Sequence, residues 1–466
     1  MTHPTAVILV VGLNRSLIGP HCPRLQAFAS KGRVRRLRPD LPAVTCSVQS
    51  SMLTGRSPGG PQGHGVVGNG YYHRQLAEIH FWKQSNHLVH GEKVWETAKK
   101  RDPSVTCANF FWWFNMYSSV DYSVTPRPVY KADGRKIPDI YTHPYSLRDQ
   151  LQERFGVFPL FHFWGPASSI RSSQWIADAA MFVSERYKPT LSLVYLPHLD
   201  YALQKLGPDH RQIPAATTEV DRVVGALIDH FQHQGVRVMI LSEYGIEAVD
   251  DGLAINVMLR QAGALQIRVE QHRELLDAGA SQAFAVADHQ VAHVYVKDPK
   301  KIPYFSDLCL GFPGVEQVLD RQHQARLNLD HQRSGDLMLV AAPGRWFCYR
   351  YWQDQRKAPD FARTVDIHRK PGYDPLELFV DPAIGLPTLQ IGWKLLKRKI
   401  GLRTLLDVIP LDEKLVRGSH GRIDQDPATA PIMITQTNHT DLPDWIQCQE
   451  VRNVILEQMF GTSRDD

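Results

Sequence analysis

The sequence lacks any cysteine pattern that would mark a metal ribbon or a disulfide-stapled domain. It has six cysteines in 466 residues, they are widely scattered, and no two have the C-x-x-C spacing. Isolated cysteines of this kind predict free thiols in a reducing cytoplasm. The six are Cys22, Cys46, Cys107, Cys309, Cys348 and Cys448.

A strong charge of one sign is also missing. The chain has 53 Lys and Arg against 48 Asp and Glu, a formal net charge of +5, and the two signs are largely interspersed. This pattern does not provide the basic stripe that binding to a nucleic-acid duplex requires. A mildly positive field still suits a small anionic substrate.

Long hydrophobic runs are absent as well. No stretch has the length of a transmembrane helix. The apolar run 6–11 near the N-terminus has neither a basic flank nor the cleavage site of an export signal. We therefore expect this run to be a buried first strand and the protein to be soluble and cytoplasmic.

The sequence does contain an alternation of strand-like and helix-like segments. Apolar, β-branched runs at 6–12, 190–196 and 236–241 are separated by helix-like segments such as 172–186 and 215–232. This order predicts an α/β fold with a mostly parallel central sheet. Ligands collect at the carboxyl ends of the strands in such sheets, which directs attention to Thr45, Asp200 and Glu243.

The length exceeds that of a usual single core, so we expect a large domain with an inserted lobe, or two domains. Residues 1–255 are predicted to form the first part of the α/β catalytic core. Residues 256–410 are less regular and are predicted to complete the sheet and to form a cap or inserted lobe. Residues 411–466 are predicted to return to the core and to carry His420.

The most informative segment is 41–72, LPAVTCSVQSSMLTGRSPGGPQGHGVVGNGYY. Thr45 lies where an extended, proline-containing stretch gives way to the helix-compatible run 46–53. Its hydroxyl is therefore expected near free backbone N–H groups and the positive end of a helix dipole, which favours a phosphate. Gly63, Gly65 and Gly68 also spell G-x-G-x-x-G, but without a preceding strand and a following helix they predict a loop.

The segment resembles the nucleotide pyrophosphatase/phosphodiesterase branch of the alkaline phosphatase superfamily, whose pattern is T…TG…P…HG(V/I)VGN. The resemblance implies an alkaline-phosphatase-like three-layer α/β core with a mostly parallel central sheet and an inserted cap. It also implies that Thr45 is the nucleophile and that Asn69 donates to a phosphate oxygen. The substrate would be a small-molecule phosphate ester or anhydride.

The same resemblance implies metal ligands, but the expected set is incomplete. Members of the superfamily use two metal ions. Val11 stands where a ligand Asp is expected, Gln204 replaces a His beside Asp200, and Glu243-Tyr244 replaces Asp-His. His420 is retained. We therefore predict one divalent ion (Zn²⁺, Mn²⁺ or Mg²⁺) rather than two, with Asp200, Glu243 and His420 as ligands and Gln204 as a weak neutral one.

Other polar side chains could supplement this set. In the run 364–375, Asp366 and His368 alternate on one face, and Arg369 and Lys370 could meet a phosphate. The alternative is a solvated loop held by local salt bridges. His289 and His293 lie on a strand-like run, where four residues span roughly 13 Å, too far to share an ion.

Two further segments have alternative interpretations. The aromatic run 110–117, FFWWFNMY, predicts either core packing or a pocket in which an organic group of the substrate stacks. The segment 393–406, WKLLKRKIGLRTLL, is basic and amphipathic. It predicts either a surface helix of the cap or a weak peripheral contact with an anionic membrane.

Together these features predict a metal-dependent phosphodiesterase or pyrophosphatase-like hydrolase that acts through a phospho-threonine intermediate. Two alternatives remain. One is a non-hydrolytic, ligand-binding relative with a decayed metal centre, suggested by Val11, Gln204 and Tyr244. The other is a transferase or isomerase that uses the same phosphoryl-transfer groups with another acceptor.

Overall fold

The computed structural model describes residues 2–366, 369–402, 404–423, 426–436 and 442–461. Within them a nine-stranded sheet has the order β23-β2-β22-β11-β1-β10-β5-β6-β9. Its strands are β1 (Thr5–Val10), β2 (Arg33–Arg38), β5 (Cys107–Phe110), β6 (Tyr122–Pro126), β9 (Ile140–His143), β10 (Leu191–Leu196), β11 (Arg237–Leu241), β22 (Ile432–Thr435) and β23 (Trp445–Gln447). The central strand β1 is parallel to both β10 and β11, and only β22 and β9 run antiparallel to their neighbours. The predicted mostly parallel sheet is confirmed.

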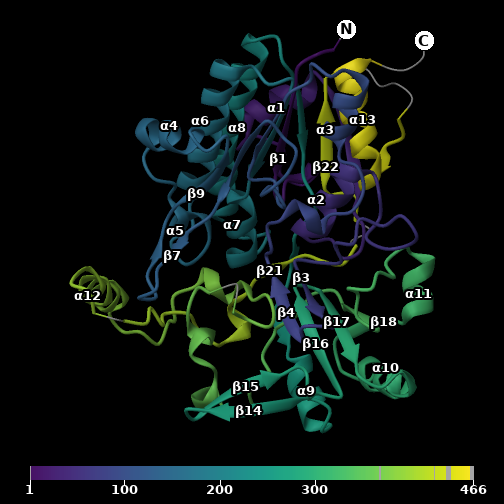
Figure 1. Cartoon of the computed structure of the whole chain (residues 1–466), viewed down its shortest axis with the longest axis vertical. Coiled ribbons are helices and arrows are strands. Elements are labelled where there is room, and N and C mark those ends of the chain that lie inside the picture. The colour runs from purple at the N-terminus through teal and green to yellow at the C-terminus, as the bar shows by residue number, and fades with distance from the viewer. Residues whose placement is uncertain (1, 367–368, 403, 424–425, 437–441, 462–466) are drawn as a thin grey trace.

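Helices cover both faces of this sheet, as Figure 1 shows. On one face α6 and α8 pack against β10 and β11, with α1 and α7 beside α8; on the other, α13 packs against β1 and contacts α2 and α3. The helices predicted at 172–186 and 215–232 are confirmed as α6 and α8. The bounds are α1 (Pro23–Ser30), α2 (Thr45–Thr54), α3 (Val94–Arg101), α4 (Leu147–Phe155), α5 (Leu160–Phe163), α6 (Ile170–Tyr187), α7 (His198–Leu206), α8 (Ile213–His233) and α13 (Val451–Phe460).

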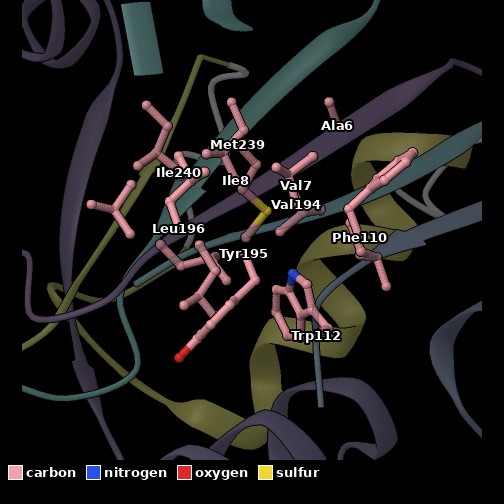
Figure 2. Close-up of a cluster of buried hydrophobic side chains, with 14 of the residues drawn as sticks. Ala6, Val7, Ile8, Phe110, Trp112, Val194, Tyr195, Leu196, Met239 and Ile240 are labelled. Carbon is pink, nitrogen blue, oxygen red and sulfur yellow. The ribbon is translucent and has the colours of Figure 1, made fainter. Parts of the chain in front are cut away.

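The core around the nine-stranded sheet is continuous and apolar, because helices cover the central strands on both faces. All six residues of β1 and all six of β10 are buried. Figure 2 shows Ile8, Val194 and Met239 from three adjacent strands in one cluster with Trp112. The apolar runs of the sequence are therefore the interior strands that fix the position of the polar residues following them.

A second, antiparallel sheet of order β16-β17-β19-β18 lies below the first in Figure 1. The sequence predicts sheet completion within 256–410, and this differs from the structure: β22 and β23 complete the central sheet instead. Only His289 and Gln290 connect β16 to β17, and so short a connection pairs the two strands antiparallel to each other. The domain boundaries at 255 and 410 stay predictions. The elements of this lobe are α9 (Ile255–Gln261), β14 (Gln266–Glu270), β15 (Arg273–Asp277), β16 (Ala283–Asp288), β17 (Val291–Val296), α10 (Ile302–Leu310), β18 (Val315–Leu319), α11 (Arg321–Arg326), β19 (Leu337–Ala341) and α12 (Pro387–Lys399).

Short two-stranded pairings connect the nine-stranded sheet with the second, antiparallel sheet. The hairpin of β3 and β4 contacts β16, and β21 pairs with β12 beside α7. Among the residues that the structure describes, none of the helices has the length and apolar character needed to span a bilayer. The bounds are β3 (Gly70–His73), β4 (Glu78–Phe81), β7 (Val129–Tyr130), β8 (Lys136–Ile137), β12 (Glu247–Ala248), β13 (Asp251–Leu253), β20 (Arg345–Phe347) and β21 (Gly418–Ser419).

Candidate active site

Thr45 is the first residue of α2, directly after an extended N-cap residue, Val44. Its hydroxyl donates a hydrogen bond to Oε1 of Glu243 at 2.9 Å and lies 3.1 Å from the hydroxyl of Tyr244. All three side chains are buried. The structure therefore places the Thr45 hydroxyl at a helix N-terminus, within hydrogen-bond distance of the carboxyl group of Glu243.

Glu243 is held from a second side by Gln49, one turn further along α2. The amide of Gln49 donates to Oε2 of Glu243 at 2.9 Å, and its oxygen accepts from the backbone N–H of Trp113 at 2.7 Å. Burial raises the pKa of Glu243 to about 8, although the hydrogen bonds from Gln49 and Thr45 oppose this rise. Gln49 was not predicted from the sequence, although its i, i+4 spacing from Thr45 on the predicted helix was the available signal.

Asn69 lies on the other side of the helix start. Its Oδ1 accepts from the backbone N–H of Cys46 at 3.0 Å, and its Nδ2 donates to Asp288 at 2.9 Å. Asp288 also accepts from the backbone N–H of Asn69 at 2.7 Å, and burial raises the pKa of this carboxyl to about 7. The carboxamide is thus fixed in orientation, and its Nδ2 has a second N–H with which to meet a substrate oxygen.

Asp200, in the first turn of α7, has a donor facing each of its oxygens. Gln204 donates to Oδ2 at 2.7 Å, and the hydroxyl of Tyr244 lies 3.4 Å from Oδ1. Burial raises the pKa of Asp200 to about 7 and raises the pKa of the Tyr244 hydroxyl above its usual value. Tyr244 therefore stays protonated and bridges Thr45 and Asp200, a role that sequence reasoning did not identify.

His420 closes the group from the C-terminal part of the chain. Its Nδ1 lies 2.8 Å from the carbonyl oxygen of Ala43, and its ring stacks on Tyr244 with centroids 3.6 Å apart. Burial lowers the pKa of His420 to about 3, so the ring is neutral and its Nε2 carries a lone pair. The segment that carries His420 passes close to α7 at Gly418. A Cβ at this position would lie 2.2 Å from the carbonyl oxygen of Leu203, so the close contact requires glycine.

The four residues predicted to converge, Thr45, Asp200, Glu243 and His420, are therefore brought together, but they do not fit a two-metal centre. Val11 is apolar and fully buried, and the protonated hydroxyl of Tyr244 fills the space between Thr45 and Asp200. Within the described part of the chain, no three His, Cys, Asp or Glu side chains are grouped so that they could hold a metal ion. What remains for a single ion is Asp200, His420 and the buried Oε1 of Gln204, which has no hydrogen-bond partner.

We expect the purified protein to hold at most one divalent ion per chain, because two strong ligands of the second position are missing. Elemental analysis by mass spectrometry, on protein purified without added metal, measures this stoichiometry. His420→Ala should release the ion, and the fourfold change Val11→Asp, Gln204→His, Glu243→Asp and Tyr244→His should raise occupancy towards two. Two tightly held ions in the natural protein would contradict the prediction.

The loop predicted to supplement the site contributes a different residue. Asp366 forms an ion pair with Arg369 at 3.1 Å, whereas His368 lies outside the described residues. Lys370 pairs with Glu377 at 2.6 Å instead of facing a ligand, and each side chain is only 2% exposed. Tyr373 reaches the site, with its ring 4.3 Å from that of His289, which in turn lies 3.7 Å from His420.

Asp374, next to Tyr373, provides a test of this buried loop. Burial raises its pKa to about 7, although Lys370 opposes the rise. Because this pKa is higher in the folded than in the unfolded chain, the stabilising effect of the protonated group is present at low pH and is lost as the pH rises through about 7. We expect Asp374→Asn to stabilise the protein by about 1 to 3 kcal/mol more at pH 8 than at pH 5. Urea unfolding at both pH values measures the difference, and an equal effect at both would contradict it.

The aromatic run 110–117 packs partly in the core, as one of its two interpretations predicts, and the stacking of a substrate group stays a prediction. Trp112 is fully buried in the core (Figure 2), whereas Trp113 packs beside Cys46 at the start of α2. The Trp82 ring contacts both Trp113 and Tyr373 of the loop described above. Its centroid lies 5.1 Å from that of Trp113 and 5.4 Å from that of Tyr373. Aromatic rings therefore line one side of the site.

Comparison with known proteins gives matches in sequence and in structure. The family model described as type I phosphodiesterase / nucleotide pyrophosphatase matches residues 5–374. An uncharacterized pyrophosphatase/phosphodiesterase of Schizosaccharomyces pombe is 24% identical over 246 residues, covering 50% of this chain and 42% of that protein. The chain thus spans less than half the length of this curated relative.

Two solved structures share the fold. Phosphonoacetate hydrolase from Sinorhizobium meliloti, in complex with phosphonoformate, superposes with a TM-score of 0.63 at 13% identity, covering 98% of this chain and 96% of that one. An inactive threonine-to-alanine variant of murine ectonucleotide pyrophosphatase/phosphodiesterase 5, in complex with AMP, gives a TM-score of 0.57 at 12% identity, covering 98% and 94%. At such low identity these likenesses concern the fold alone.

Proposed function

Because the chain belongs to the type I phosphodiesterase/nucleotide pyrophosphatase family, within the alkaline phosphatase superfamily that its sequence resembles, we propose that it hydrolyses a small-molecule phosphate ester or anhydride through Thr45. The observation that carries the proposal is the hydrogen bond from the Thr45 hydroxyl to the carboxylate of Glu243, at the N-terminus of α2. The carboxamide of Asn69 lies beside the same helix start.

The geometry supports a two-step reaction. The Thr45 oxygen attacks phosphorus while its proton moves to Oε1 of Glu243, and the bond from phosphorus to the leaving oxygen breaks. The second N–H of Asn69 and the free N–H groups of α2 would donate to the non-bridging oxygens as negative charge develops. Water then attacks phosphorus of the phospho-threonine, and the bond from phosphorus to the Thr45 oxygen breaks. The proton held by Glu243 returns to that oxygen, and the phosphate carrying the oxygen of water is released.

This sequence of steps passes through no metal ion, because the side chains do not fit the two-metal centre of the superfamily. A single divalent ion held by Asp200, Glu243 and His420, with Gln204 as a weak neutral ligand, stays a prediction that the metal stoichiometry above tests. Glu243, a predicted ligand, instead accepts hydrogen bonds from Thr45 and Gln49.

The substrate class is supported by what related folds bind. The two solved structures hold phosphonoformate and AMP, which are small anions containing phosphorus. In the murine protein the replaced residue of the inactive variant is a threonine. The predicted cytoplasmic location stays a prediction.

The test is turnover of bis-p-nitrophenyl phosphate combined with trapping of the intermediate. Rapid acid quenching followed by peptide mass spectrometry should find phosphate on Thr45. In ¹⁸O-labelled water the label should enter the released phosphate product, whereas transfer to another acceptor would leave that product unlabelled.

One alternative has a specific observation in its favour. The Tyr244 hydroxyl occupies the space between Thr45 and Asp200, as expected of a ligand-binding relative whose metal centre has decayed. Saturable binding of a phosphate ester, without turnover under any added divalent metal, would establish this alternative and overturn the hydrolase.

A further inference from the structure

The helix α12 carries an apolar face that points away from the protein. Figure 1 shows α12 standing out from the body of the molecule on the side of α5 and β7. Seven large apolar side chains of this region are between 49% and 69% exposed, Leu395 and Leu402 among them. The other five recur along one side of the helix. They are Leu386, Leu389, Trp393, Leu396 and Ile400.

The spacing of these five residues is three and four positions in turn, so they form one stripe along the helix. The body of the protein meets the opposite side. Ile391 packs against the small apolar cluster around Trp346 and Leu376, and Lys394 pairs with Asp407. A surface helix normally turns its apolar stripe to the core. This helix is anchored by its other side and exposes the stripe.

The charge of the segment complements an anionic surface. Residues 386–405 contain five of the 53 Lys and Arg of the chain and none of the 48 Asp and Glu, so the rest of the chain is balanced. The ammonium group of Lys397 lies 5.2 Å from the centre of the Trp393 ring. An apolar stripe with an exposed Trp, flanked by basic residues, is the composition of helices that lie in the headgroup region of a membrane.

We propose that α12 docks the protein on an anionic lipid bilayer, with the Leu386–Ile400 stripe inserted among the acyl chains and the basic residues at the headgroups. A helix of 13 residues is about 20 Å long, shorter than the roughly 30 Å of a bilayer core, so it lies along the surface. This inference does not depend on the proposed reaction, because it uses no residue of the active site.

The experiment is sedimentation of the full chain with phosphatidylcholine vesicles, with and without about one-third phosphatidylglycerol. We expect binding to the anionic vesicles that weakens as NaCl is added, because the electrostatic attraction is screened. The double change Trp393→Ser and Leu396→Ser should reduce the partition constant at least tenfold, about 1.4 kcal/mol. Lys397→Glu should weaken binding to the anionic vesicles alone.

Leu76→Ser and Val269→Ser are matched controls, since those side chains are 58% and 64% exposed elsewhere on the protein. They should leave vesicle binding unchanged, and thermal unfolding should verify that every variant is folded. Equal binding by the α12 variants and the controls, or no binding to anionic vesicles, would overturn the proposal. Self-association in buffer that the Trp393→Ser and Leu396→Ser change abolishes would overturn it too, by identifying the stripe as a protein interface.

Discussion

Replacing Thr45 by alanine is expected to reduce turnover of bis-p-nitrophenyl phosphate by about 10,000-fold or more. The change removes the oxygen that would bond to phosphorus, and loss of a covalent nucleophile has far larger effects than loss of a positioning group. The Thr45 side chain is small and its partners are polar, so the fold should remain. Steady-state kinetics, with circular dichroism of the same preparation, measure both quantities.

Two further variants make this result specific. Asn69→Ala removes one donor to the developing negative charge and should reduce turnover by about 100-fold. Thr45→Ser keeps a hydroxyl in the same place and should retain the phospho-enzyme. If Thr45→Ala turned over like the natural protein, the proposed nucleophile would be excluded.

The second large effect concerns stability. Lys370→Met should lower the free energy of unfolding by about 3 to 5 kcal/mol, because it leaves a buried carboxylate without its partner. Lys370 and Glu377 are each 2% exposed and 2.6 Å apart, and Glu377 also accepts from the indole N–H of Trp164 at 2.9 Å. Urea unfolding of the two proteins at neutral pH measures the difference.

The control is an exposed pair of similar geometry. Arg135 and Asp133 are 2.7 Å apart but 50% and 45% exposed, so Arg135→Met should leave the free energy of unfolding nearly unchanged. The double change Lys370→Met and Glu377→Gln should recover part of the loss, since it removes the uncompensated charge. A change below about 1 kcal/mol for Lys370→Met would contradict the buried-pair argument.

Much of the nine-stranded sheet and its helices could be predicted, because local sequence patterns determine where these strands and helices form. The buried strands read as continuous apolar runs, and the helix that begins at Thr45 follows from the residues around it. The G-x-G-x-x-G loop was recognisable from its flanking sequence. The helix predicted within 393–406 instead spans Pro387–Lys399. Proline suits the first turn, and Gly401, with a φ of 85°, terminates it.

The contacts that orient the site could not be predicted in the same way. Glu243 meets Gln49 across 194 positions of sequence, and Asp288 meets Asn69 across 219. No local pattern encodes such pairings, because they depend on how elements far apart in the sequence pack together. The hydroxyl of Tyr244 was unexpected for a related reason. The sequence shows which ligand it replaces, but only the structure shows that it reaches both Thr45 and Asp200.

The hydrogen bonds that Asp288 accepts from Asn69 make the second sheet part of the site. The Thr45 hydroxyl lies on the helix α2, whereas the carboxyl that orients the neighbouring carboxamide lies on β16 of the second sheet. Replacing either residue alone would leave a buried polar group of the other without its hydrogen bond. The second sheet therefore contributes to the site directly, because a change in β16 would alter the orientation of the carboxamide beside Thr45.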